Sequence, residues 1–286
     1  MIKTYYLVTK PGIIVGNAIT VAGGFALGSR GSFNPLLFLV TMIGLSLVIA
    51  SACVFNNCID RHADQKMMRT KNRPLATGVI TVGQAILFAS ILGIMGLSVL
   101  AVYTNLLTVS IAAMGFIIYV FLYSFWKYRT TYATEIGSFA GGVPPVVGYC
   151  AASGQFDLGA LLLFLVVAFW QMPHFFSIAM YRFSDYSAAS IPVLPIKKGM
   201  QATKKRMMLY IIAFILATLS LTAMGYTGYN YLVVSSILGV AWLFLCIKGL
   251  RSENDALWAR NMFRLSLLII LVLSVMISVD VVTLPL

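Results

Sequence analysis

An amide and two carboxylates stand four residues apart, directly after a long apolar run. They are Asn56, Asp60 and Asp64, and the run before them is Pro35–Phe55. At about 100° per residue, helical positions with this spacing lie within roughly 80° of one helix face. The two like charges repel each other, so a cation must offset them. Oxygen ligands of this kind suit Mg²⁺, which is commonly held by one or two carboxylates together with substrate phosphates.

A group of basic side chains follows the acids and would suit an anion of several charges. Its members are Arg61, Lys66, Arg69, Lys71 and Arg73. The two groups together predict a Mg²⁺–diphosphate site at a membrane surface. Basic residues after a membrane span also serve simply as topology signals, and that alternative stays open for the cations. It explains the acids less well, because the chain has only 8 acids in 286 residues.

The composition excludes a soluble domain. The chain is 60% hydrophobic and 10% charged, with a mean hydropathy of +0.93, whereas soluble domains are about 25% charged. The net charge of +12 falls between apolar runs, which favours membrane orientation over nucleic-acid binding. The four cysteines form no CxxC pair and are interpreted as small packing residues. The N-terminus lacks a cleavage site and is expected to be a retained cytosolic end.

We predict an all-α, polytopic membrane protein with about nine transmembrane helices, at about 20 apolar residues per crossing. The expected spans are Ile13–Leu27, Pro35–Phe55, Gly83–Tyr103, Leu106–Trp126, Tyr132–Ala152, Leu158–Tyr181, Met208–Gly225, Tyr231–Lys248 and Phe263–Leu284. With nine spans, every Lys and Arg except Arg30 falls on the side of the N-terminus. This asymmetry assigns that side, and with it the Asn56 segment, to the cytoplasm.

A second polar segment follows the sixth span, on the same side as the first. It runs from Tyr181 to Gly199, and Asp185 is its only acid. Pro192 and Pro195 break helix continuation, so the segment is expected to fold back as a lid or hairpin.

Within the sixth span, the sequence WQMPH places Trp170 and His174 where the bilayer is expected. An ionisable residue inside a span is by default a candidate functional residue. His174 either lines a cavity and contacts a metalloporphyrin, since imidazole is a natural iron ligand, or is a structural histidine bonded to a neighbouring helix. Tyr119 and Tyr123 likewise fit two readings: residues of the interfacial belt, or cavity walls whose ring faces stabilise positive charge.

Four segments resemble the UbiA superfamily of intramembrane prenyltransferases, and within it the protohaem IX farnesyltransferases (haem O synthases). They are VTKPGIIVGN, NNCIDRHADQKMMRTKNRP, WQMPHF and DYSAASIPVLP. The N-x-x-x-D-x-x-x-D motif with R-T-x-N-R-P marks the superfamily, while WQMPH and the DY…IP-x-LP segment are similar to the haem branch. The resemblance implies one integral-membrane prenyltransferase domain over 1–286, with a central cavity capped by cytoplasmic loops, in the cell inner membrane.

By the same resemblance, Asn56, Asp60, Asp64 and Asp185 would hold Mg²⁺. Arg69 and Arg73, with Lys66 as a helper, would bind the diphosphate. Two departures stand out: Ala189 occupies the position four after Asp185, where many members have a second acid, and Tyr128 interrupts the usual Lys-Arg pair. A second Mg²⁺ is therefore in doubt, and Lys127 and Arg129 are left without a role.

The implied reaction transfers a farnesyl group from farnesyl diphosphate to a vinyl group of haem B, with water addition, giving haem O and diphosphate. A downstream haem A synthase or terminal oxidase assembly is the implied partner. Within the same fold, a quinone precursor is the alternative acceptor. CDP-alcohol phosphotransferases need a longer upstream motif that this chain lacks, and a transporter would carry its acids nearer mid-membrane.

Overall fold

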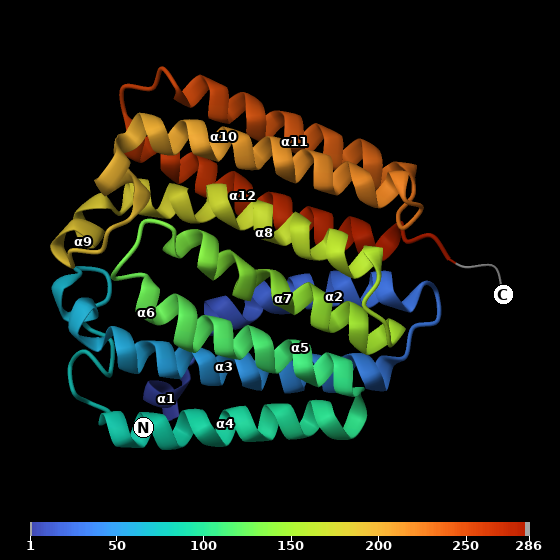
Figure 1. Ribbon diagram of the computed structural model, residues 1–286, viewed down its shortest axis with the longest axis horizontal. Helices are drawn as coiled ribbons and strands as arrows, with labels where there is room; N and C mark the ends of the chain where they lie inside the picture. Colours follow the sequence, from blue (N-terminus) through green and yellow to red (C-terminus); the bar gives the residue numbers. More distant parts are fainter. Residues whose placement is uncertain (1, 284–286) are drawn as a thin grey trace.

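The computed structural model describes residues 2–283, most of which lie in helices. The helices form one bundle in which most axes run roughly parallel or antiparallel (Figure 1). Their bounds are α1 Ile2–Val8, α2 Pro11–Ser29, α3 Pro35–Lys66, α4 Val82–Tyr103, α5 Leu106–Ile117, the π-helical η1 Ile118–Tyr123, α6 Ser124–Trp126, α7 Ala133–Ser153, α8 Leu158–Tyr181, α9 Phe183–Ala188, α10 Leu194–Ala223, α11 Tyr229–Gly249 and α12 Asp255–Val279.

Eight segments of the described chain are long and apolar enough to cross a membrane, with α5, η1 and α6 counting as one. The one expected span outside these eight, Tyr132–Ala152, corresponds to α7, a 21-residue helix that contains Pro144 and Pro145 and packs between α2 and α8. Large apolar side chains cover the outer helices α4 and α11, where a bilayer would meet them. The chain is therefore a multi-pass membrane protein. The last expected span ended at Leu284, which lies outside the described residues.

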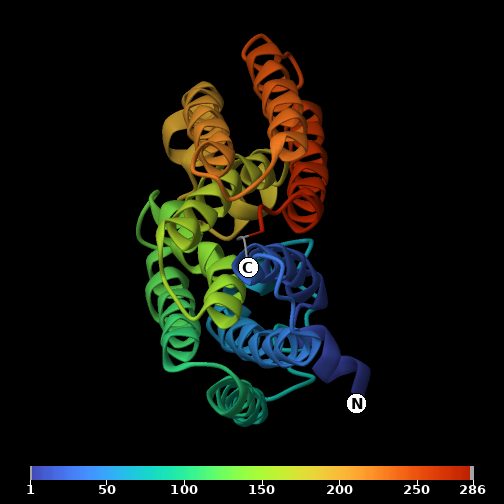
Figure 2. The ribbon, with the colours of Figure 1, turned by 90° about the vertical axis from the view of Figure 1, so that its right-hand side faces the viewer.

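The N-terminal helices α2, α3 and α4 lie on one side of the bundle and α10, α11 and α12 on the other (Figure 2). Helices α7 and α8 pack against each other between them. Glycines bring α2 and α7 into backbone contact: a Cβ at Gly148 would stand 2.3 Å from the Val21 carbonyl oxygen, and one at Gly24 would stand 2.0 Å from that of Pro145. Small residues permit this approach in a membrane, where lipid gives no hydrophobic drive for helix association.

Helix α3 is longer than a membrane crossing requires. Its 32 residues extend over roughly 48 Å at 1.5 Å per residue, against about 30 Å of hydrocarbon. The apolar part is the expected span Pro35–Phe55, and the helix continues without a break through Asp64 to Lys66. The last turns of α3 therefore carry the acidic residues to one end of the bundle.

The second polar segment lies at that same end (Figure 1). Helix α9 ends at Ala188, and the chain then leaves helical geometry before Pro195 enters the first turn of α10. Pro192 lies in this connection, and α10 then packs back along α8, so the chain does reverse here. The lid or hairpin expected for this segment stays a prediction. Helix α10 is kinked at Gly199, whose φ of 84° is accessible mainly to glycine.

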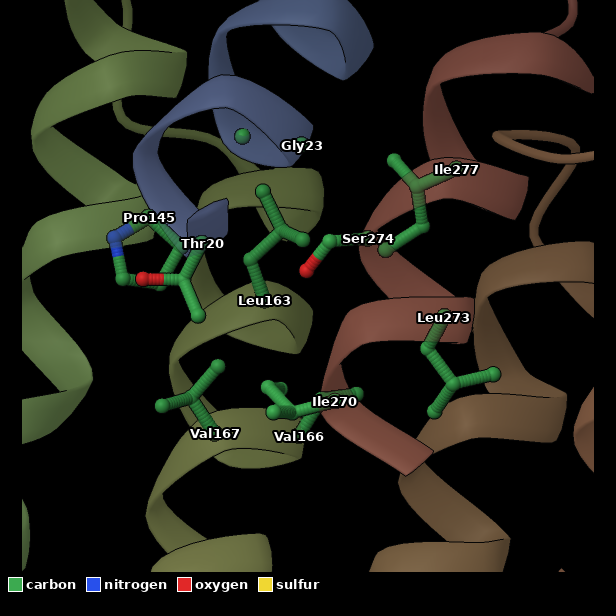
Figure 3. Close-up of a pocket in the computed structure, with 11 residues that line it drawn as sticks. Thr20, Gly23, Pro145, Leu163, Val166, Val167, Ile270, Leu273, Ser274 and Ile277 are labelled. Atoms are coloured by element: carbon green, nitrogen blue, oxygen red, sulfur yellow. The ribbon is translucent and has the colours of Figure 1, made fainter. Parts of the chain in front are cut away.

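A small cavity lies deeper in the bundle, where α2, α7, α8 and α12 meet (Figure 3). Its volume is about 10 Å³, close to the minimum for one water molecule. Side chains such as Leu163, Ile270 and Ile277 make the lining mostly apolar, with the hydroxyls of Thr20 and Ser274 beside them. This space is a packing gap rather than a substrate chamber, so the larger central cavity expected from the sequence stays a prediction.

Candidate active site

The predicted ladder of oxygen ligands occupies one buried face at the end of α3. Asn56, Asp60 and Asp64 are 2%, 8% and 4% exposed. Their burial follows from the packing of this end of α3 against the α6 turn, the loop after α3 and the N-terminal segment. Carboxylates are buried only when they are paired or bound to metal, because desolvation of an isolated charge is costly.

Each member of the ladder has a cationic partner. Lys127 forms an ion pair with Asp60, and Arg73 Nη1 donates to both oxygens of Asp64 at 3.0 and 2.9 Å. Lys10 Nζ donates to the amide oxygen of Asn56. Cations that offset the repulsion between the two acids are therefore present, and they come from three separate segments of the chain.

The structure separates the predicted diphosphate-binding cations into two classes. We call Asn56, Asp60 and Asp64, together with the cations bonded to them, the acidic cluster. Arg73 lies in this cluster, whereas Lys66 and Arg69 are exposed and neither of the two forms an ion pair with a described residue. Lys10 and Lys127 also lie in this cluster, although no role was predicted for either. One signal was available for both: each immediately flanks an apolar span on the side that carries the acids.

Lys10 is placed by an unusual backbone conformation. It precedes α2 with φ 55° and ψ 64°, in the left-handed region that non-glycine residues seldom adopt. This conformation joins α1 to α2 and turns the ammonium toward Asn56. Burial is the main cause that lowers the pKa of Lys10 to about 8. The residue is therefore a cation held in a costly position, as is common at binding sites.

Tyr128 provides a second contact to the acidic cluster. Its hydroxyl donates to Asp60 Oδ1 at 2.8 Å. Burial, and then the negative charge of Asp60, raise the pKa of Tyr128, so its hydroxyl stays protonated and serves as a donor. The residue that interrupts the expected Lys-Arg pair thus contacts the first acid of the motif.

Asp185 is joined directly to the loop that follows α3. Its Oδ1 accepts a hydrogen bond of 2.9 Å from the backbone N–H of Met68. Next to this bond, Met67 packs with Ala189 and Ile191, which come from the segment after α9. The structure therefore brings the two polar segments together, as their positions after the second and sixth spans suggested.

Tyr119 and Tyr123 lie in η1, and their rings stack with centroids 5.4 Å apart. Ser124 connects this segment to α3: its hydroxyl donates to the Tyr119 carbonyl and accepts from the Asn56 amide. The Lys127 ammonium, which pairs with Asp60, lies 5.5 Å from the Tyr123 ring centroid. Both tyrosines therefore adjoin the acidic cluster. Single π-helical turns of this kind are frequent at functional sites, and no sequence pattern predicted this one.

Trp170 and His174 lie in a different place, between α8 and α12. Their rings stack 4.7 Å apart, and both bind Ser266. Trp170 Nε1 donates to its carbonyl at 2.8 Å, and His174 Nδ1 lies 2.7 Å from its hydroxyl. The structural role that the sequence allowed for His174 is thus present, and it occupies only one of the two ring nitrogens.

The donor set fits Mg²⁺ bound through its substrate. Within residues 2–283, no three His, Cys, Asp or Glu side chains gather as a complete cage. Mg²⁺ does not need one, because it keeps water ligands and is commonly bound by one or two carboxylates plus substrate phosphates. Asp60 and Asp64 are such a pair, with the Asn56 amide oxygen on the same helix face.

The comparisons with known proteins agree with this geometry. The model of the UbiA prenyltransferase family matches residues 17–268. A protoheme IX farnesyltransferase from Protochlamydia amoebophila is 57% identical over 99% of this chain and 100% of its own. A digeranylgeranylglyceryl phosphate synthase structure superposes with a TM-score of 0.82 at 19% identity, covering 99% of both chains.

A further solved structure, a UbiA homologue from Archaeoglobus fulgidus bound to GPP and Mg²⁺, superposes with a TM-score of 0.69. It is 14% identical and covers 96% of this chain and 99% of its own. At such identities the superpositions establish the fold, and the family match together with the sequence relative establishes the lineage. The chain belongs to the UbiA prenyltransferase family.

Proposed function

We propose that this chain is a Mg²⁺-dependent protohaem IX farnesyltransferase. It transfers the farnesyl group of farnesyl diphosphate to a vinyl group of haem B, and water addition then gives haem O, with release of diphosphate. The relative at 57% identity carries this name over the full length of both chains. The single structural observation that carries the assignment is the buried, cation-paired Asn56/Asp60/Asp64 face at the mouth of a membrane helix.

The acidic face would bind the metal–diphosphate group. Asp60 and Asp64 are the proposed metal ligands, with Asn56 on the same face and Asp185 presented from α9. The Archaeoglobus homologue was solved with GPP and Mg²⁺, which is consistent with this role. When bound, Mg²⁺ would neutralise negative charge on the diphosphate and so make it a better leaving group.

The cations of the site have a dual use. In the structure, Lys127 and Arg73 neutralise Asp60 and Asp64, and Lys10 binds the Asn56 amide oxygen. These cations can turn to the phosphate oxygens once the acids bind the metal. The acids are then balanced by Mg²⁺ and the cations by the diphosphate. Donors that tighten as charge develops on the departing diphosphate lower the barrier to breaking the C–O bond. Lys66 and Arg69 would assist from the exposed rim of the site.

The allylic carbon that loses diphosphate becomes cationic and must be kept from water until it meets the vinyl group. The stacked rings of Tyr119 and Tyr123 offer π faces beside the acidic cluster, and such faces stabilise positive charge. A new carbon–carbon bond then joins the farnesyl carbon to the vinyl group. Water adds to the resulting cation and loses a proton, which gives the hydroxyethylfarnesyl side chain.

We also propose the orientation, the location and the route of the product. The connections that carry every Lys and Arg except Arg30 would face the cytoplasm, in the cell inner membrane. Haem O would pass to a haem A synthase or terminal oxidase assembly, and the whole of 1–286 would act as one domain. An impermeant thiol reagent should then label Gln155→Cys from outside spheroplasts, and Glu253→Cys only after lysis. Labelling of Glu253→Cys in intact spheroplasts would reverse the orientation.

The function is tested with purified protein, radiolabelled farnesyl diphosphate and one of two acceptors, haem B or 4-hydroxybenzoate. We expect labelled haem O with haem B alone, and no product after Mg²⁺ is chelated. Prenylation of 4-hydroxybenzoate in place of haem B would assign the chain to the quinone branch of the family.

A further inference from the structure

A continuous wall of four rings runs along the contact between α8 and α12. Its centroid separations are 4.7 Å from Trp170 to His174, 5.0 Å from His174 to Phe263 and 5.6 Å from Phe263 to Tyr181. Helices α8 and α12 pack against each other although they are far apart in the sequence, so the wall joins residues about 90 positions apart. We refer to these four residues as the aromatic wall.

Two guanidinium groups stand at the Tyr181 end of the wall. Arg182 Cζ lies 5.3 Å and Arg260 Cζ 5.8 Å from the Tyr181 ring centroid. Neither forms an ion pair with an acid among residues 2–283. Arg182 Nε is in addition buried and has no hydrogen-bond partner in the described structure. An unpartnered buried donor is costly, so this end of the wall lacks an acceptor.

The imidazole in the middle of the wall is fixed in one tautomer. The Ser266 hydroxyl donates its only proton to the Phe263 carbonyl at 2.6 Å. It must therefore accept from His174 Nδ1, which lies 2.7 Å away. Nδ1 then carries the ring proton and Nε2 keeps a lone pair that no described residue occupies. A histidine oriented in this way by a neighbouring oxygen is suited to bind a metal through Nε2.

From these contacts we propose that the aromatic wall is the acceptor-binding surface, with the two carboxylates of the porphyrin at Arg182 and Arg260. This inference rests on the proposed function, and it adds the acceptor's orientation. Aromatic side chains supply the apolar contact area that a porphyrin ring needs. Guanidinium groups bind carboxylates through paired, charge-assisted hydrogen bonds. His174 Nε2 would face the central iron of the substrate.

The position of the arginines suits an amphiphilic ligand. Arg182 follows the last residue of α8 and stands three residues before Asp185, so it lies at the end of the bundle that holds the acidic cluster. The rest of the wall extends from Tyr181 toward the interior, where the next turns of α8 and α12 are apolar (Figure 3). The carboxylates would then stay at the aqueous boundary while the ring body enters the bundle.

The test compares two ligands that differ only in the proposed contact: protohaem and its dimethyl ester, in which both carboxylates are neutralised. Binding of each to the detergent-solubilised protein is followed by absorption titration. We expect the wild type to bind protohaem at least about tenfold more tightly than the ester, because the ester cannot form charge-assisted hydrogen bonds to the arginines. Arg182→Gln/Arg260→Gln should lose this preference and bind the ester as the wild type does.

Two controls separate the contact from general damage. Arg251→Gln removes an exposed arginine from the connection between α11 and α12, and it should leave the preference unchanged. Farnesyl diphosphate binding, which uses the acidic cluster, should be unchanged in both variants. Equal binding of the two ligands by the wild type would overturn the proposal without requiring any variant to fold.

A double variant that weakens both ligands equally would also overturn it, because the arginines would then serve the fold and not the carboxylates. Failure of the proposed function has a different signature. In that case the wild type would form no haem O from bound haem B, whatever its preference between acid and ester.

Discussion

The acidic cluster at the end of α3 and the aromatic wall between α8 and α12 differ in how their charges are paired. The cluster gathers charge in a buried place: Asp60 pairs with Lys127, Asp64 pairs with Arg73, and Lys10 donates to the Asn56 amide oxygen. The wall gathers neutral rings and keeps its cations unpaired at one end. The first arrangement can exchange internal ion pairs for a metal–diphosphate group. The second places apolar rings beside two guanidinium groups that have no ion pair to exchange.

The comparison predicts that removing an acid has the largest effect. Asp60→Asn or Asp64→Asn should lower haem O formation by about 100-fold or more, because charge stabilisation at a leaving group commonly supplies that much. Rates are measured with saturating haem B. Glu253→Gln, an exposed acid in another connection, is the matched control and should keep full activity. Activity within a few-fold of wild type in either aspartate variant would remove the metal assignment.

The cations of the cluster should rank next. Arg73→Gln and Lys127→Gln should each weaken farnesyl diphosphate binding about tenfold, as expected for a lost charge-assisted bond. Lys66→Gln should have a smaller effect because its side chain is exposed. Binding is measured by isothermal titration in the presence of Mg²⁺. If Lys66→Gln weakens binding more than Lys127→Gln does, the rim and not the buried cluster holds the diphosphate.

The wall should respond to a different ligand. His174→Ala should weaken protohaem binding about tenfold and leave farnesyl diphosphate binding unchanged, because no described contact joins His174 to the acidic cluster. Ser266→Ala should have a smaller effect of the same kind, since it frees the imidazole tautomer. Haem absorption spectra of both variants provide the measurement. An unchanged protohaem titration in His174→Ala would reduce this residue to a structural role.

The smallest expected effect concerns the packing that supports the cluster. Gly148→Ala places a methyl group 2.3 Å from the Val21 carbonyl oxygen, which forces α2 and α7 apart at a cost of about 1–3 kcal/mol. Gly12→Ala is the control on α2, where a Cβ meets nothing within 4 Å. Thermal unfolding in detergent should show a lower midpoint for Gly148→Ala only. A lower midpoint for Gly12→Ala alone would contradict the close α2–α7 contact.

Residues on one helix were predictable, and residues brought together from several helices were not. The spacing of Asn56, Asp60 and Asp64 fixes their common face wherever α3 is helical, so a local period was sufficient. Lys10 reaches Asn56 across 46 positions through a left-handed residue that no motif predicts. The bond between His174 and Ser266 spans 92 positions, and Ser266 resembles any other small residue of a membrane helix.

Eight of the nine expected spans were confirmed as membrane-length apolar helices for the same reason, because apolar length is a local property. The sequence did not predict that α12 begins at Asp255 or that η1 is π-helical. Those boundaries depend on contacts across the bundle, such as the bond from Asn56 to Ser124.

The central claim is that the α3 acids bind farnesyl diphosphate through Mg²⁺. It is tested most directly by titrating farnesyl diphosphate into the wild type and Asp60→Asn/Asp64→Asn, each with Mg²⁺ and with chelator. The account predicts that Mg²⁺ tightens binding to the wild type by about tenfold or more and has no effect on the double variant. Equal tightening by Mg²⁺ in both proteins would place the metal elsewhere and contradict the account.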